Sequence, residues 1–165
     1  MPETPLCEAL FRQACSHFAT GVAIAAVRDR SGAPHGLTVN SFTSVSMKPP
    51  LVLICVDKRA AILEQFLESD YYSVNILAAE NEELSNRFAT LPEHRFEGVR
   101  WRPGRTGAPL IEGSIASLEC ARKPPVEAGD HLILLAEAVA AEVHAGAPLL
   151  YFRSRYARLF SPDSE

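Results

Sequence analysis

The strongest constraint on the fold is a series of short apolar segments that do not alternate regularly with helices. Segments such as 22–27, 51–56 and 72–76 are rich in branched residues and bounded by turn-forming residues, as strands are. Helical spacing predicts helices near 4–21 and 80–91, with another after residue 57. We count about six or seven strands, which favours a mainly β chain of the α+β class over a doubly wound parallel sheet. The expected architecture is a barrel or sandwich with helices attached.

Local signals predict the ends and the burial of several elements. Thr4-Pro5 predicts the start of an amphipathic helix that ends near Gly21. Asp57 is expected to cap the second helix directly. The inward positions of this helix are Ile62, Leu63, Phe66 and Leu67. The uninterrupted apolar run Leu51–Val56 predicts a strand buried on both faces. Residues 131–143 are ambiguous because their Ala and Glu content favours helix, whereas the apolar run that opens them favours strand; we expect a strand.

Composition indicates one globular domain that spans residues 1–165. The chain is 47% hydrophobic and 22% charged, which supports one sizeable core and is too apolar for disorder. Its net charge of −4, from 16 basic and 20 acidic residues, gives no broad attraction for a phosphate backbone or an anionic membrane. We therefore expect neither a nucleic acid nor a membrane as partner.

Cysteine usage and the N-terminal residues predict a soluble cytoplasmic protein. Cys7, Cys15, Cys55 and Cys120 form no CxxC pair and are expected to be reduced thiols. No signal-peptide pattern and no apolar run of about 20 residues is present. The HExxH, GxSxG, GxGxxG and P-loop signatures are also missing, so we expect no metal site and no Rossmann or P-loop nucleotide site.

The first candidate site is the hydroxyl-rich segment Gly36–Ser46, where small and hydroxyl residues crowd an irregular strand. Its alternation slips between Asn40 and Phe42, which predicts a bulge or kink that re-aims backbone groups. Short side chains let a flat heterocycle approach the backbone, and the hydroxyls suit a polyol or a phosphate. The alternative is that these Thr and Ser residues only populate an exposed sheet face. The candidate residues are Thr38, Val39, Asn40, Ser41, Ser44 and Ser46.

Two further candidates lie at turns. The segment Val56–Ala60 is expected to present free backbone N–H groups to an anion, beside the cations Lys58 and Arg59. The alternative is that these cations are solvated charges beside a capping Asp57. The turn Gly129-Asp130-His131 delivers an imidazole to the start of a strand, where it can stack on a ligand or form a hydrogen bond with it.

Together these segments resemble the flavin reductase family, which has the FMN-binding split-barrel fold. The similarity extends over nearly the whole chain, through the stretches FATGVAIAAV, GLTVNSFTSVSMKPPLVLICVDK, YYSVNILAAENEELSNRFA, GDHLILLAEA and PLLYFRSRY. Within that family the chain is most like the small reductase components of two-component aromatic monooxygenases. The resemblance implies a homodimer with FMN or FAD in a groove near the subunit interface.

The resemblance also implies roles for individual residues. Thr38 to Ser41 would face the flavin ring and ribityl chain, whereas Ser46, Lys58 and nearby backbone would face the phosphate. His131 matches the family histidine that is associated with the nicotinamide. The remaining residues that the resemblance places at the cofactor are Ser44, Cys55, Val56, Asp57, Arg59, Arg87, Phe88, Ala89, Tyr151 and Arg153. Many relatives have a hydroxyl residue just after the basic pair, where this chain has Ala60-Ala61, so we expect exchangeable flavin.

The activity implied is hydride transfer from NADH or NADPH to FMN or FAD, with reduced flavin passed to a monooxygenase. The cofactors carry the electron chemistry, and the protein supplies orientation. Arginines 95, 100, 102 and 105 could pair with the 2′-phosphate of NADPH or simply keep their loop soluble. Two alternatives stay open: a flavin-binding or haem-binding protein without turnover, and an oxidase of the pyridoxamine-phosphate-oxidase type.

Overall fold

The computed structural model describes residues 6–159, which form three helices and thirteen strands. The Thr4-Pro5 start of the first predicted helix lies outside these residues. The helices are α1 (Glu8–Ser16), α2 (Leu63–Glu68) and α3 (Glu82–Thr90). The strands are β1 (Thr20–Gly21), β2 (Ala23–Arg28), β3 (Pro34–Val39), β4 (Thr43–Met47), β5 (Pro50–Asp57), β6 (Tyr71–Leu77), β7 (Trp101–Pro103), β8 (Pro109–Ile111), β9 (Ser114–Arg122), β10 (Val126–Ala128), β11 (His131–Val143), β12 (Leu150–Phe152) and β13 (Arg155–Ala157).

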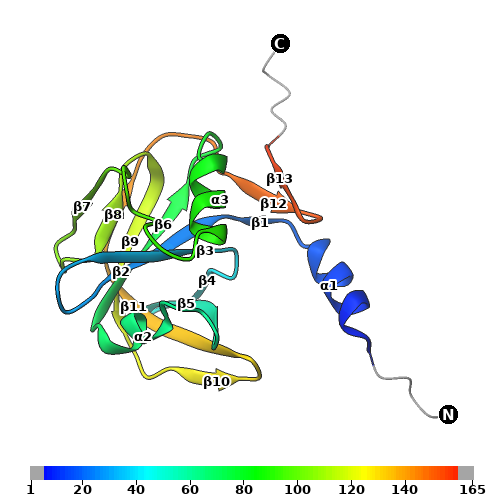
Figure 1. The fold of residues 1–165 in the computed structure, drawn as a ribbon, viewed down its shortest axis with the longest axis horizontal. Coiled ribbons are helices and arrows are strands. Elements are labelled where there is room, and N and C mark those ends of the chain that lie inside the picture. Colours follow the sequence, from blue (N-terminus) through cyan, green and yellow to red (C-terminus); the bar gives the residue numbers. More distant parts are fainter. Residues whose placement is uncertain (1–5, 160–165) are drawn as a thin grey trace.

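The main sheet is antiparallel and curls on itself (Figure 1). Its strand order is β3-β2-β6-β9-β11-β5-β4, and β10 pairs with β11. Strands β3 and β4 lie at opposite ends of this order, yet only residues 40–42 connect them. A link this short spans at most about 14 Å, so the two ends of the sheet must approach each other. This curled sheet agrees with the expected split barrel.

The connection between the two sheet ends, Asn40–Phe42, is here called the crossover segment. The Ser41 hydroxyl accepts a hydrogen bond from the Cys55 backbone N–H at 2.9 Å and contacts the Cys55 carbonyl oxygen at 3.3 Å. A serine side chain therefore takes the place of a strand partner where the sheet closes. The predicted irregularity is confirmed as a strand break here, and a true β-bulge follows between Ser44 and Ser46.

Several sequence expectations for individual elements are confirmed. Residues 131–143 form the strand β11, whose first half alternates between buried and half-buried residues while pairing with β5. Residues 72–76 lie in β6, and the third predicted helix is α3. Residues 131–143 form a strand despite their helix propensity, because both edges of this segment pair with neighbouring strands.

Two expectations around β5 are wrong. Only Val52, Ile54 and Val56 are buried, and the residues between them are half-buried, because one face of this antiparallel strand packs on the core and the other faces outward. Asp57 does not cap a helix. Its carboxylate accepts the Arg59 N–H at 2.8 Å and forms a turn, and α2 begins only at Leu63. The inward positions expected for that helix do face the core.

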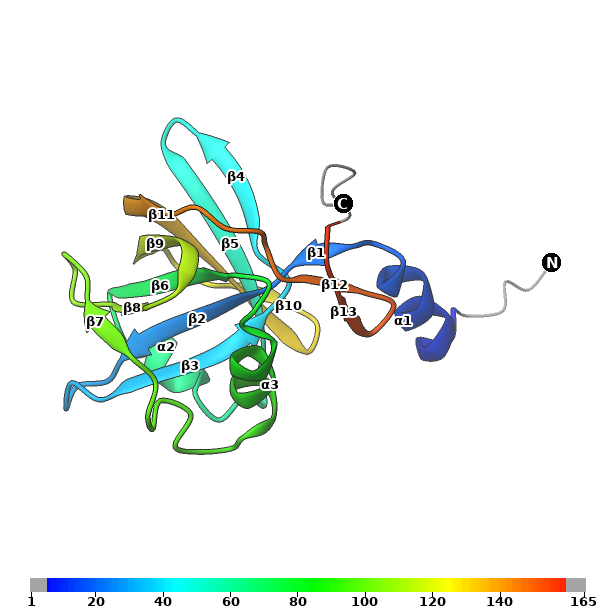
Figure 2. The same cartoon turned by 90° about the horizontal axis from the view of Figure 1, so that it is seen from above.

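Helix α1 and the small sheet β1-β12-β13 extend from one side of the main sheet (Figures 1 and 2). No residue of α1 is buried, and Leu10 and Phe11 are each 53% exposed. Phe18, just after the helix, is 77% exposed. The first helix therefore forms near its expected place, ending earlier than the sequence predicts, but its apolar face is uncovered within the described chain.

The core is held by apolar packing and by buried polar residues, among which Asn75 connects the most strands. Asn75 is fully buried on β6, where its amide donates to the Ile24 and Pro109 carbonyls at 3.2 Å. Its side-chain oxygen accepts the Ile111 N–H at 3.0 Å and the Ser117 hydroxyl at 2.9 Å. Asn75 thus joins β2, β6, β8 and β9. Among residues 6–159, no helix is long and apolar enough to span a membrane.

Candidate functional site

The crossover segment separates two neighbouring cavities that share Asn40. The first, the α3 cavity, has a volume of about 410 Å³ and lies between β3, α3 and the β12–β13 hairpin. The second, the crossover cavity, has a volume of about 600 Å³ and lies between the end of β1, the start of β2 and the crossover segment. Both volumes are in the range of small-molecule sites. Of the predicted site residues, Thr38, Asn40, Ser41, Ser44, Ala89 and Tyr151 line one or both cavities.

Hydrogen bonds fix the walls of the α3 cavity. Thr38 donates its hydroxyl to the Ser85 carbonyl at 2.7 Å, which ties β3 to α3. Tyr156 of β13 donates to the Ser85 hydroxyl at 2.8 Å and lies 3.1 Å from the Asn86 side-chain oxygen. The Tyr151 and Tyr156 rings pack edge to face, with centroids 5.5 Å apart. The cavity walls are therefore preorganised before any ligand binds.

The crossover cavity offers polar atoms that have no partner in the described chain. The Thr20 hydroxyl oxygen is buried there and makes no hydrogen bond within residues 6–159. Asn40 is exposed at the junction of the two cavities, and Phe42 and Ile76 supply apolar wall. This combination of apolar wall with one unpaired hydroxyl and the exposed Asn40 amide fits a planar heterocycle that carries polar atoms along its edge.

The turn Asp57–Ala60, here called the cationic turn, does not present free backbone N–H groups. Lys58 N–H donates to the Asp130 carbonyl and Ala60 N–H to the Asp57 carbonyl, both at 2.9 Å. The Arg59 N–H donates to the Asp57 carboxylate. The expectation of an amide-lined anion site at a helix start is therefore wrong, because the turn at Asp57 and the Asp130 carbonyl take up these donors. Only the Lys58 and Arg59 side chains remain for an anion.

His131 lies at the start of β11 directly opposite Asp57 of β5. Its Nδ1 is 2.7 Å from the Asp130 carboxylate, which can only accept, so Nδ1 carries the proton and Nε2 remains for a ligand. The hydrogen bond from His131 lowers the pKa of Asp130. His131 shares the outward face of the sheet with Cys55, whose backbone binds Ser41. The third candidate therefore lies on the outward face of the sheet, with β5 between it and the crossover segment.

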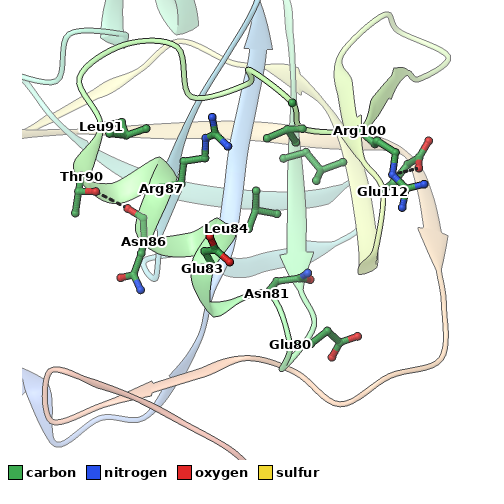
Figure 3. A pocket seen from close by; sticks show the side chains of 13 residues that line it. Glu80, Asn81, Glu83, Leu84, Asn86, Arg87, Thr90, Leu91, Arg100 and Glu112 are labelled. Carbon is green, nitrogen blue, oxygen red and sulfur yellow. Dashed lines mark hydrogen bonds and ion pairs between the residues drawn. The ribbon is translucent and has the colours of Figure 1, made fainter.

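Arg87 lies in a different place from the other predicted residues. It lines a groove of about 650 Å³ between α3 and the segment Gly98–Arg100 (Figure 3), which borders the α3 cavity at Asn86 and Thr90. Arg100 and Glu112 form an ion pair at 3.4 Å on the opposite wall. The Arg87 Nε atom is buried without a partner in the described chain. We call this space the outer groove.

Several other predicted site residues have side chains that line neither cavity. The side chains of Val39, Val56 and Phe88 are buried in the core, so only their backbone could contact a cofactor. Ser46 pairs with Leu51, six residues before Asp57 on β5, which puts Ser46 about 20 Å from the cationic turn within one chain. Arg153 is exposed at the β12–β13 turn, 5.3 Å from the Phe152 ring.

Sequence reasoning assigned no role to Thr20, Ser85, Asn86 and Tyr156. All of them line the two cavities. The stretches that carry the family resemblance contain these residues, but no local pattern distinguishes them from ordinary polar positions. Their proximity depends on the packing of α3 and β13 against β3, which the sequence alone does not fix.

Comparison with known proteins decides the family. A model of the flavin reductase like domain matches residues 15–159 of this chain. The chain belongs to this flavin reductase family. The resemblance inferred from the sequence is thereby confirmed, and the mainly β split-barrel fold is confirmed by the solved structures that the chain resembles. Within residues 6–159 no cluster of three or more His, Cys, Asp or Glu residues could hold a metal ion.

Three curated relatives are similar over most of this chain. An NADH-dependent FAD reductase from Streptomyces globisporus is 38% identical over 159 residues, which is 93% of this chain and 86% of that protein. The reductase subunit of a flavin-dependent monooxygenase from Rhodococcus jostii is 32% identical, over 93% of this chain and 78% of that protein. A probable flavin reductase from Rhizobium meliloti is 39% identical over 88% of this chain, which spans about half (47%) of that longer relative.

The solved structures include an NADH:FAD oxidoreductase from Streptomyces globisporus in complex with NAD and FAD fragments. It superposes on this flavin reductase chain with a TM-score of 0.89 at 38% identity, covering 98% of both chains. The superposed backbone therefore includes nearly all of the elements that line the two cavities.

Proposed function

We propose that this protein is an NADH-dependent flavin reductase that acts on FMN or FAD. The observation that carries the proposal is the pair of preorganised cavities that meet at Asn40, in a chain whose relatives are named as NADH-dependent flavin reductases. The chemistry supplied by the bound molecules is transfer of a hydride from the nicotinamide C4 to the flavin N5. The protein needs no nucleophile for this reaction and contributes position and polarity.

The residues at the junction of the cavities would hold the flavin ring. Thr38 is fixed to α3, and Ser41 is fixed to β5, so the backbone between them is held at both ends. That backbone and the Asn40 amide can address the polar edge of a heterocycle. Short side chains along the crossover cavity allow the ring to approach closely. Ordering these groups before binding lowers the entropic cost of orienting the reactants.

His131 would orient the nicotinamide. Its protonated Nδ1 is fixed by Asp130, so the imidazole plane is held by a 2.7 Å hydrogen bond rather than left to rotate. A neutral imidazole there offers Nε2 as an acceptor and the ring face for stacking. The proposed role of His131 in the reaction is to contact and orient the bound nicotinamide.

NADH is the proposed donor because three of the four arginines that could bind a 2′-phosphate, all except Arg105, already have a side-chain partner in the described chain. Arg95 donates to the Gly36 carbonyl at 2.7 Å, Arg100 pairs with Glu112, and Arg102 forms a close ion pair with Glu142. Relatives whose names specify the nicotinamide are NADH-dependent.

A homodimer is proposed from the uncovered apolar surface. Leu10 and Phe11 of α1 are each 53% exposed, and Val45 and Met47 of β4, which projects from the sheet in Figure 2, are 48% and 83% exposed. Surfaces of this kind are usually covered by another chain. Ser46 is far from the cationic turn of its own chain. In a dimer it would be able to contact the flavin site of the second subunit instead.

A flavin-dependent monooxygenase is the proposed partner in metabolism, since several relatives are named as reductase components of such enzymes. The reduced flavin would leave this protein and be used there. All four cysteines are unpaired thiols, which suits the proposed cytoplasmic location.

An anaerobic assay tests the proposal. We expect NADH oxidation only when FMN or FAD is added, with NADPH a poorer donor. His131→Ala is expected to slow flavin reduction by NADH in stopped flow about tenfold or more, an effect in the range of lost orientation, while flavin affinity stays within about twofold. Flavin binding without any reduction by NADH would indicate a binding protein instead. An unchanged reduction rate in the variant would remove His131 from the mechanism.

A further inference from the structure

The cationic turn contains two cations, and each is already paired with an acidic side chain of this chain. Lys58 Nζ lies 2.5 Å from the Glu127 carboxylate, and the Arg59 guanidinium lies 2.8 Å from Asp57. Asp130 lies in the adjoining turn and accepts from His131. Apart from His131, the cluster holds two positive and three negative side chains. The place where the family resemblance would put a flavin phosphate therefore has no net attraction for an anion.

The two ion pairs differ in how they are built. Asp57 is part of the turn itself, since its carboxylate accepts both the backbone and the side chain of Arg59. Removing it would change the turn. Glu127 comes from β10, a separate hairpin arm, and its side chain is 79% exposed. Within residues 6–159 its carboxylate forms an ion pair with Lys58 alone. Its removal leaves the turn intact and frees one cation.

We propose that Glu127 competes with the flavin phosphate for Lys58 and thereby keeps the affinity for FMN low enough for the flavin to exchange. The proposal rests on the proposed function. A phosphate dianion must displace the Glu127 carboxylate before it can pair with Lys58, and it is repelled by that carboxylate until it does. Riboflavin, which has the same ring and ribityl chain but no phosphate, does not meet this competition. Glu127 is therefore a determinant of the preference between FMN and riboflavin.

Fluorescence titration of the intact protein with FMN and with riboflavin tests this competition in Glu127→Gln. Because exposed ion pairs of this kind contribute little each, we expect the Kd for FMN to fall about threefold to fivefold at low salt. The Kd for riboflavin should change by less than about 1.5-fold. The gain for FMN should shrink at high salt and should vanish in the double variant with Lys58→Met.

The matched control is Glu137→Gln. Glu137 pairs with Lys123 at 2.6 Å, and the two side chains are 35% and 40% exposed, respectively. Glu137 lies on β11, as His131 does, but about 20 Å from it. This variant removes the same charge and should leave both titrations unchanged.

Three results would overturn the proposal: an unchanged or raised Kd for FMN in Glu127→Gln, an equal change for riboflavin, or the same gain in the Glu137 control. If the unmodified protein binds neither flavin, the proposed function fails as well. Because riboflavin binding reports on the ring site alone, the two failures are distinguishable.

Discussion

The Ser41 hydroxyl connects the crossover segment to β5, so Ser41→Ala should both loosen the fold and disturb the site. The substitution removes an acceptor at 2.9 Å from the Cys55 N–H and a weaker contact at 3.3 Å to the Cys55 carbonyl. It leaves a half-buried backbone N–H without its partner, which costs about 1–2 kcal/mol of unfolding free energy. For a chain of this length the thermal midpoint should fall by about 2–8 °C.

Urea denaturation followed by Trp101 fluorescence and riboflavin titration measure the two effects. We expect Ser41→Ala to lower the unfolding free energy by that amount and to weaken riboflavin binding, because the backbone beside Asn40 is no longer held at one end. Ser44→Ala is the matched control, since Ser44 is exposed and lines the same cavity, and its change should stay within about 0.5 kcal/mol. Equal stability and equal riboflavin affinity in the two variants would refute the argument that Ser41 closes the sheet.

Three further predictions concern Asn75, Cys120 and Asp57. Asn75→Ala should lower the unfolding free energy in urea by about 3 kcal/mol or more, because it leaves several buried partners unsatisfied; a loss under about 1 kcal/mol would contradict the network. Burial raises the pKa of the Cys120 thiol to about 12, so thiol reagents at pH 8 should modify the exposed Cys7 and Cys15 first and Cys120 only on unfolding. The hydrogen bonds from Arg59 hold the pKa of Asp57 well below its usual range, so its contribution to stability is present above about pH 4 and is lost as the pH falls further. The thermal midpoints of wild type and Asp57→Asn should differ by a constant amount from pH 8 to 5 and converge below about pH 4, and a gap that widens in acid would reverse the sign of this argument.

Much of the local structure follows from the sequence. The branched apolar segment 72–76 identifies β6, the apolar run that opens residues 131–143 identifies β11, and helical spacing identifies α3. The burial of β5 on one face only could not be predicted, because it depends on which strands pair and how the sheet curls. Asp57 was misjudged because the same Asp can cap a helix or form an Asx turn, and the Arg59 N–H at 2.8 Å selects the turn.

The candidate site was predicted in its chemistry and only partly in its arrangement. Thr38, Asn40 and Ser41 do come together at one pair of cavities, as the hydroxyl-rich segment suggested. Ser46 and Lys58 do not, because the crossover segment carries the chain to the opposite end of the sheet and β4 then runs away from the cationic turn. Sequence spacing cannot reveal that separation, since it depends on the register of β4 with β5.

The most direct test of the account is the electron density of crystals soaked with riboflavin. We expect the three-ring system against the crossover segment, with its polar edge toward the backbone beside Asn40. Rings bound in the outer groove beside Arg87, or protein that leaves riboflavin fluorescence unchanged in solution, would contradict the account.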